Sequence, residues 1–222
     1  MVFAEQTVDS GMAALMVSTT ALWMVLLAWL WQRGARPGPR VIAGLLLGLA
    51  GVALLVRPGS GELDPLGLSL LGFSAFNWAL GSTYSRKAAL PKAPLLSTGM
   101  QLVSGGAVLL ALSFLLGEPG RFDPSALHLT GILSFVYLVV GGAIVGYPVY
   151  IWLIKAAPPA LASTYAYVNP MVAVFLGWFF AGEPVGKGTL VAAAVIVAGV
   201  ALISSASARP ARARRAEPAP EV

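Results

Sequence analysis

Seven long apolar segments run through this sequence, and they constrain its fold more than any other feature. They lie near residues 12–31, 41–56, 66–85, 97–116, 129–154, 161–180 and 187–204. An α-helix rises about 1.5 Å per residue and the hydrocarbon core of a bilayer is about 30 Å thick, so one span takes about 20 residues. The sequence therefore predicts an all-α integral membrane protein with seven transmembrane helices.

The composition excludes several other classes of protein. Hydrophobic residues make up 58% of the 222 residues and charged residues only 10%, whereas about a quarter of a soluble domain is charged. A soluble enzyme and a nucleic-acid binder are thus excluded, and the expected partner is the lipid bilayer. There is no cysteine and one histidine, His128, so we expect no metal site and no cofactor.

The cations of the connecting loops predict an orientation. Alternate loops and the tail hold eleven lysines and arginines on one side of the membrane and three on the other. The side richer in cations stays in the cytoplasm. We therefore expect a multi-pass protein of the plasma (inner) membrane with a cytoplasmic C-terminus. Residues 205–222 are rich in proline, alanine and arginine, which predicts a disordered cytoplasmic tail.

An internal repeat relates the two ends of the chain. The pentapeptide AGVAL occurs at residues 50–54 and again at residues 198–202, 148 residues later, and an offset of 149 aligns Trp29 with Trp178. The matching spans lie five spans apart, so the two copies cross the membrane in opposite directions. This order is typical of the inverted repeats of secondary transporters.

The repeat also predicts missing helices. Three spans precede the matching pair in the second copy, whereas only residues 1–11 precede it in the first copy. We expect these residues to be the stub of a truncated helix. Residues 12–56 are then a partial first repeat of two spans, and residues 66–204 are a complete second repeat of five. Such a chain is not expected to transport on its own.

Several motifs resemble a known family. They include NWALGSTYSRKAALP, YLVVGGAIVGYPVYIWL and above all STYAYVNP, which continues through GW to GEP. The chain resembles the EamA family of the drug/metabolite transporter superfamily, and within it the YedA-like inner-membrane exporters. The resemblance implies a ten-helix bundle of two inverted five-helix repeats that exports or exchanges small metabolites or amphiphilic compounds through a central cavity. Ala21 stands where the repeat's proline would be expected.

Polar residues near the centres of spans three and six are candidates for substrate binding. Asn77 and Trp78 lie on one polar stripe of residues 66–85, and Tyr165 and Asn169 share a face of residues 161–180. Each asparagine could instead bond a neighbouring helix or freed backbone. Pro170 removes a backbone donor and frees the carbonyl near residue 166, which indicates a hinge.

Spans four and five supply further candidates. Gln101 and Tyr147 are candidate substrate contacts, although both lie near the cytoplasmic end of their spans, and Pro148 is a second candidate hinge. Gly142 and Gly146 are spaced as a GxxxG contact, for which packing is the better interpretation.

Acidic, basic and histidine residues do not occur at mid-depth in any of the seven segments. Catalysis in the membrane usually needs such groups, so the chain is not expected to be an enzyme. The leading hypothesis is a transporter for a small-molecule substrate. The alternative is a non-transporting membrane remnant or a partner subunit, completed by a second copy in a homodimer or by a complementing chain.

Overall fold

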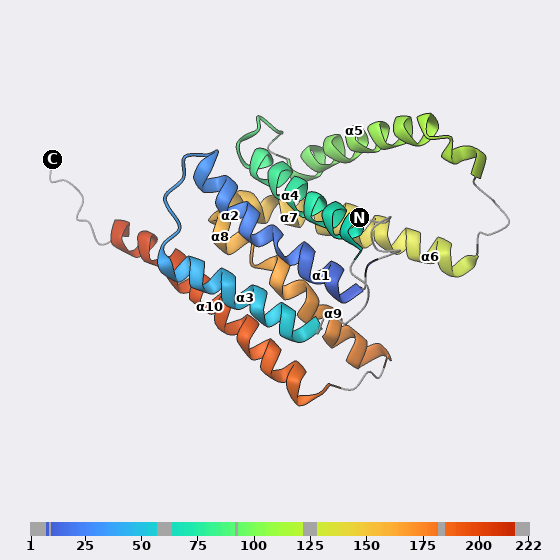
Figure 1. Cartoon of the computed structure of the whole chain (residues 1–222). Helices are drawn as coiled ribbons and strands as arrows, with labels where there is room; N and C mark the ends of the chain where they lie inside the picture. The colour runs from blue at the N-terminus through green and yellow to red at the C-terminus, as the bar shows by residue number, and fades with distance from the viewer. Residues whose placement is uncertain are drawn as a thin grey trace. The chain divides into compact units, whose positions relative to one another are not determined.

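The computed structural model describes residues 8, 10–56, 64–91, 93–121, 128–181 and 185–215. Every regular element within these ranges is a helix, which confirms the predicted all-α class (Figure 1). The chain divides into two compact units. Unit 1 combines Met1–Tyr84 with Ala157–Val222, and unit 2 is Ser85–Ala156.

Unit 1 contains most of the helices. They are α1 (Ser10–Ser18), α2 (Thr20–Leu30), α3 (Pro39–Val56), all but the last turn of α4 (Pro65–Lys87), α8 (Pro159–Ala162), α9 (Tyr165–Ala181) and α10 (Lys187–Arg215). Unit 2 contains α5 (Pro94–Leu115), a 3₁₀ turn at Glu118–Arg121, and one continuous rod made of α6 (Leu129–Tyr137), a π-helix (Leu138–Gly146) and α7 (Tyr147–Ala156).

Within the described part of the chain, six helical segments are long and apolar enough to cross a membrane. They are Met12–Leu30, Pro39–Val56, Pro94–Leu115, Leu129–Ala156, Pro159–Phe180 and Lys187–Ser207. The remaining predicted span is α4, which has 23 residues and therefore sufficient length. Its serines, its threonine and Asn77 lower its mean hydropathy. The protein is thus a multi-pass helical membrane protein.

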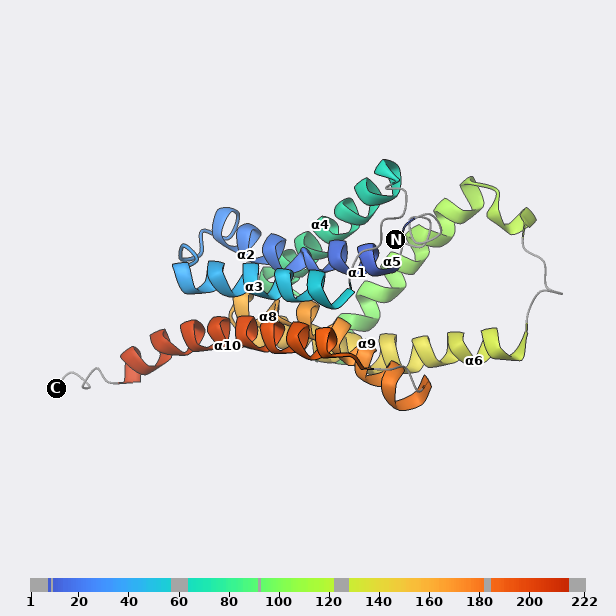
Figure 2. The same cartoon turned by 60° about the horizontal axis from the view of Figure 1, so that its bottom comes forward.

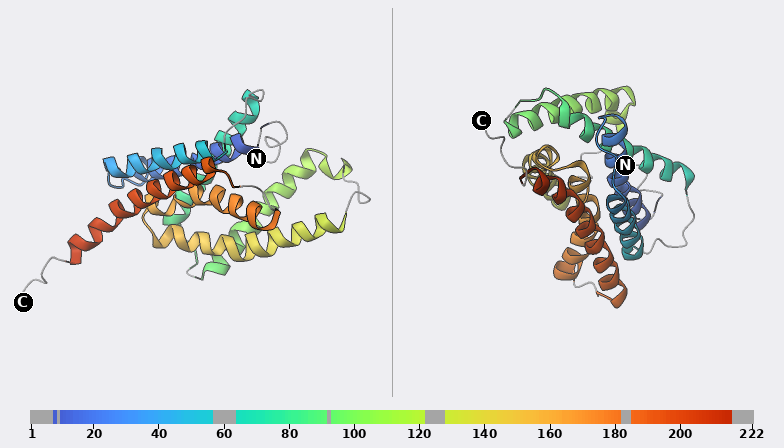
Figure 3. Two further views of the ribbon diagram at one scale, coloured as in Figure 1. Left: turned by 90° about the horizontal axis from the view of Figure 1, so that it is seen from below. Right: turned by 90° about the vertical axis from the view of Figure 1, so that its left-hand side faces the viewer.

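Helices α3 and α10 pack at very short distance. A Cβ atom on Gly199 would lie 2.8 Å from the carbonyl oxygen of Gly44 and 2.8 Å from the amide nitrogen of Gly48. Toward the other end of α3, a Cβ on Gly51 would lie 2.6 Å from Cγ1 of Ile196. As residue numbers rise along α3, the numbers of the residues that they contact on α10 fall. The two helices are therefore antiparallel (Figures 2 and 3). Only glycine allows this approach.

The contacts between α3 and α10 obey a two-fold relation. The offset of 148 pairs Gly44 with Ala192 and Gly51 with Gly199. Exchanging the copies therefore turns the contact of Gly44 with Gly199 into one of Gly51 with Ala192, and both contacts are present. The repeat seen in the sequence is thus expressed in the packing, with the two copies running in opposite directions.

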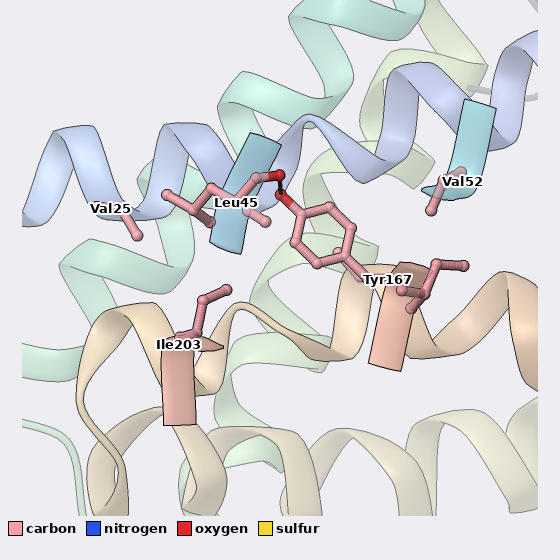
Figure 4. Close-up of a cluster of buried hydrophobic side chains, with 8 residues drawn as sticks. Val25, Leu45, Val52, Tyr167 and Ile203 are labelled. Atoms are coloured by element: carbon pink, nitrogen blue, oxygen red, sulfur yellow. Dashed lines mark hydrogen bonds between the residues drawn. The ribbon is translucent and has the colours of Figure 1, made fainter. Parts of the chain in front are cut away.

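Tyr167 anchors the core between these helices. Its side chain is fully buried, its ring packs against Gly48, and its hydroxyl donates to the carbonyl of Leu45 at 3.0 Å (Figure 4). Buried apolar residues from α2, α3, α9 and α10 surround it, including Val25, Val52 and Ile203. The cluster therefore joins helices of both copies.

The C-terminal end differs from the prediction. Helix α10 continues to Arg215, whereas the sequence predicted a helix end near residue 204 and disorder beyond. Alanine and arginine are among the strongest helix formers, and extending an existing helix avoids a new nucleation step. Residues 216–222, and residues 1–7 and 9 of the predicted stub, lie outside the described residues.

A π-helix directly precedes Pro148 in span five. It pairs residues five apart, and its last bond runs from the amide of Tyr147 to the carbonyl of Gly142. The predicted GxxxG contact is not formed within the described chain. A Cβ on Gly142 would meet no atom within 4 Å, and one on Gly146 would meet only the carbonyl of Gly141.

Candidate functional site

Two of the predicted site residues meet in unit 1. The indole Nε1–H of Trp78 on α4 donates to the hydroxyl of Tyr165 on α9 at 2.6 Å. Trp78 is 47% exposed and Tyr165 is half-buried. The bond therefore fixes two amphipathic aromatic side chains while leaving much of the indole available for contact.

The two asparagines behave differently from this pair. The side-chain amide of Asn77 donates to the carbonyl of Phe73, one turn back on its own helix, at 2.8 Å. This bond is neither a bond to a neighbouring helix nor a contact with a substrate. Asn169 is exposed. The placement of Asn77 and Asn169 around one cavity with Trp78 and Tyr165 stays a prediction.

Two aromatic contacts connect α2 and the residue that follows it with α4. The rings of Trp23 and Phe76 meet edge to face at 5.3 Å between centroids, and Trp31, directly after α2, stacks on Tyr84 at 6.4 Å. None of these four residues was among the candidates predicted from the sequence. Their spacing in the sequence could have indicated these contacts. Trp23 and Trp31 lie eight residues apart, and so do Phe76 and Tyr84, so two parallel helices can form both aromatic pairs.

A hydrogen-bond network in unit 2 contains the other two candidates. The Oε1 of Gln101 accepts from the hydroxyl of Tyr147 at 3.1 Å and from Ser85 at 3.4 Å, and its Nε2 donates to the carbonyl of Ser97 at 3.1 Å. Tyr147 also stacks on Tyr150 at 6.2 Å. Both ends of the Gln101 amide are bonded within the protein, so a substrate would compete with these bonds.

A charged residue lies close to this network. The guanidinium of Arg86, at the end of α4, donates to the carbonyl of Ile154 near the end of α7. The last carbonyls of a helix lack donors within the helix, and arginine is a suitable partner for them. This bond ties the two helix ends together inside unit 2.

The carbonyl freed by Pro170 has a partner that the sequence did not suggest. The hydroxyl of Ser18 on α1 lies 3.2 Å from the carbonyl oxygen of Ala166, and both residues are buried. The sequence had suggested Asn169 or a bound ligand as the partner of this carbonyl. The structure assigns the contact to Ser18.

Comparison with known proteins now defines the family. Residues 65–205 match the model of the EamA-like transporter family. The chain belongs to this family. The match covers α4 to α10 and confirms the resemblance that the motifs indicated.

Curated relatives agree with this assignment. The chain is 35% identical over 200 residues to the uncharacterized inner membrane transporter YedA of Escherichia coli K12, covering 90% of this chain and 63% of YedA. It is 27% identical over 207 residues to protein PecM of Dickeya dadantii, covering 92% and 68%. It is 26% identical over 199 residues to the uncharacterized transporter YvbV of Bacillus subtilis, covering 89% and 64%.

A solved crystal structure shares the fold. It matches with a TM-score of 0.70 at 24% sequence identity, over 92% of this chain and 70% of the other. This likeness supports the arrangement of the helices. The chain itself spans less than two thirds of the length of YedA. That three further helices precede these residues stays a prediction.

Proposed function

We propose that this EamA-family chain belongs to a carrier that exports or exchanges small metabolites or amphiphilic compounds across the inner membrane. The observation that carries the proposal is the bond between Trp78 and Tyr165. It joins two helices of one unit through an exposed indole and a half-buried phenol, in a family whose members are named as transporters.

The chemistry of this pair suggests how a cargo would be held. An indole face attracts a cation or an aromatic ring, and a tyrosine hydroxyl can exchange hydrogen bonds with a polar group. The pair offers no full charge. A cargo would thus be recognised by stacking and by neutral hydrogen bonds, which suits small amphiphilic molecules and permits release.

The remaining candidates are assigned within each unit. In unit 1, Asn77 and Asn169 would add amide groups from α4 and α9. In unit 2, Gln101 and Tyr147 would contact a substrate nearer the cytoplasmic ends of their own spans. Pro148 and Pro170 would permit movement of the helices that carry them. The cation count supports a cytoplasmic C-terminus.

Removing only the Tyr165 hydroxyl should weaken binding of a cargo. Tyr165→Phe deletes the acceptor that orients Trp78, at a cost of about 1 to 1.5 kcal/mol, so we expect the Kd to rise about tenfold. Scintillation-proximity binding to the purified chain measures this, with radiolabelled amino acids and tetraphenylphosphonium as probes.

The matched control is Tyr137→Phe. Tyr137 lies on α6 and is 73% exposed, and the substitution removes the same atom. Its Kd should stay within about twofold of that of the unmodified chain. An equal effect of both substitutions would contradict the proposed site, and so would the absence of saturable binding for every probe.

A further inference from the structure

The contact between Ser18 and Ala166 occurs where the hydrogen-bond ladder of α9 is interrupted. In an α-helix the carbonyl of residue 166 accepts from the amide of residue 170. Residue 170 is proline, which has no amide hydrogen. The Ser18 hydroxyl lies 3.2 Å from that same carbonyl oxygen. It comes from α1, which is far away in the sequence and belongs to the other copy of the repeat.

Burial makes this donor important. Ser18 is 1% exposed and Ala166 is 4% exposed, so water cannot replace the missing amide. A backbone carbonyl without a donor in an apolar interior is strongly destabilising. The side chain that lies against it is therefore expected to donate its proton.

A second acceptor competes for the Ser18 proton. The hydroxyl also lies 2.8 Å from the carbonyl oxygen of Ala14, one turn back on α1. Serines in helices often make such bonds, as Ser104 does with Met100 at 2.8 Å. Ala14, however, lies inside α1, where its carbonyl already accepts from the regular ladder. Ala166 has lost that donor, so the greater gain comes from bonding Ala166.

We propose that Ser18 is a positioning residue that supplies, from the first copy of the repeat, the hydrogen bond that Pro170 withdraws from α9. The proline break in α9 is then stabilised by α1 and not by α9 alone. The inference concerns the helices themselves and does not depend on which cargo is carried.

A second hydrogen bond between the two copies supports this role. The offset of 149 that aligns the first spans of the two copies places Ser18 opposite Tyr167. Ser18 donates from the first copy to Ala166 of the second, and Tyr167 donates from the second copy to Leu45 of the first. The two donors thus stand at equivalent positions of the repeat, whereas their acceptors, on α9 and α3, do not correspond. The turn of α9 that precedes Pro170 is held to the first copy at two adjacent residues.

Beyond Pro170 the surroundings of α9 change. Val172, Phe175 and Leu176 are all exposed. Before the proline, hydrogen bonds to α1 and α3 fix the first turn of α9. After the proline, the helix is less buried. Ser18 fixes the point from which that part extends.

A double-mutant cycle tests the pairing. Ser18→Ala should lower the folding equilibrium constant of the chain about 3- to 18-fold, the range expected for one hydrogen bond between helices in a membrane protein. In a Pro170→Ala background the amide of residue 170 satisfies Ala166, so Ser18→Ala should then change the constant less than about twofold. Reversible unfolding in mixed detergent micelles measures all four chains.

The cycle separates the bond from simple packing. Loss of side-chain volume at Ser18 would act equally in both backgrounds, and equal effects would overturn the proposal. Ser104→Ala is the control, because its hydroxyl bonds only within α5 and should show no coupling to Pro170→Ala.

A second comparison keeps Pro170 in place. Threonine and valine have nearly the same shape, but only threonine carries a hydroxyl. Ser18→Thr should therefore fold with an equilibrium constant at least about threefold higher than that of Ser18→Val. Equal stability of the two variants would overturn the proposal, even if Pro170→Ala failed to fold.

Discussion

Leucine in place of Gly199 is expected to leave almost no folded protein. A Cβ atom at this position would lie 2.8 Å from two backbone atoms of α3, and backbone cannot move aside as a flexible side chain can. Overpacking costs about 1 to 3 kcal/mol even where side chains can adjust, so we expect at least a 100-fold fall in the folding equilibrium constant. Unfolding in detergent micelles, followed by circular dichroism, measures it.

Helix propensity predicts the opposite change, because leucine is a better helix former than glycine by nearly 1 kcal/mol. Gly105→Leu is the matched control. A Cβ on Gly105 meets no atom within 4 Å, so this variant should be as stable as the original chain or more so. If Gly199→Leu folded as well as Gly105→Leu, the close packing of α3 on α10 would be wrong.

Replacing Arg86 with methionine should have the next largest effect. The change keeps a long side chain but removes the charged donor to the carbonyl of Ile154. Hydrogen bonds to charged groups contribute about 1.5 to 3 kcal/mol. The folding equilibrium constant should thus fall between about 10-fold and 100-fold, and amides near the end of α7 should exchange hydrogen faster.

Lys155→Met provides the comparison for this substitution. Lys155 also lies near the end of α7, and its replacement also removes one positive charge. Unlike Arg86, however, Lys155 has an exposed side chain. Its stability should change by less than about twofold. Equal losses for Arg86→Met and Lys155→Met would show that charge alone matters, and would refute a specific role for the bond to Ile154.

Length and hydropathy were sufficient to predict six of the seven long helical segments as membrane spans. A membrane helix must satisfy its own backbone, so a long apolar segment has few other conformations available. The repeat was also informative, because the AGVAL offset identified Gly51 and Gly199 as equivalent before their contacts were known. The effect of Pro170 on the carbonyl of residue 166 followed from covalent structure alone.

The partners of polar groups were harder to predict. Nothing in the pattern around Ser18 indicates a carbonyl 148 residues away, because a single serine in an apolar helix carries no periodic signal. Asn77 illustrates a second difficulty, since its side-chain amide donates to a backbone carbonyl of its own helix. Local bonds of this kind compete with contacts between helices, and tertiary packing decides between them.

The central claim is that α3 and α10, from the two copies of the repeat, cross the membrane in opposite directions. The most direct test is to measure on which side of the membrane the ends of these two helices lie. The chain has no native cysteine, so single cysteines can be introduced at Arg36 before α3, at Gly186 before α10 and at Ser207 near its end. In intact cells a membrane-impermeant maleimide should label only the cysteine at 186. The cysteines at 36 and 207 should react only after the cytoplasmic side is exposed. Exchange of all three would reverse the orientation alone, whereas opposite sides for positions 36 and 207 would contradict the antiparallel packing itself.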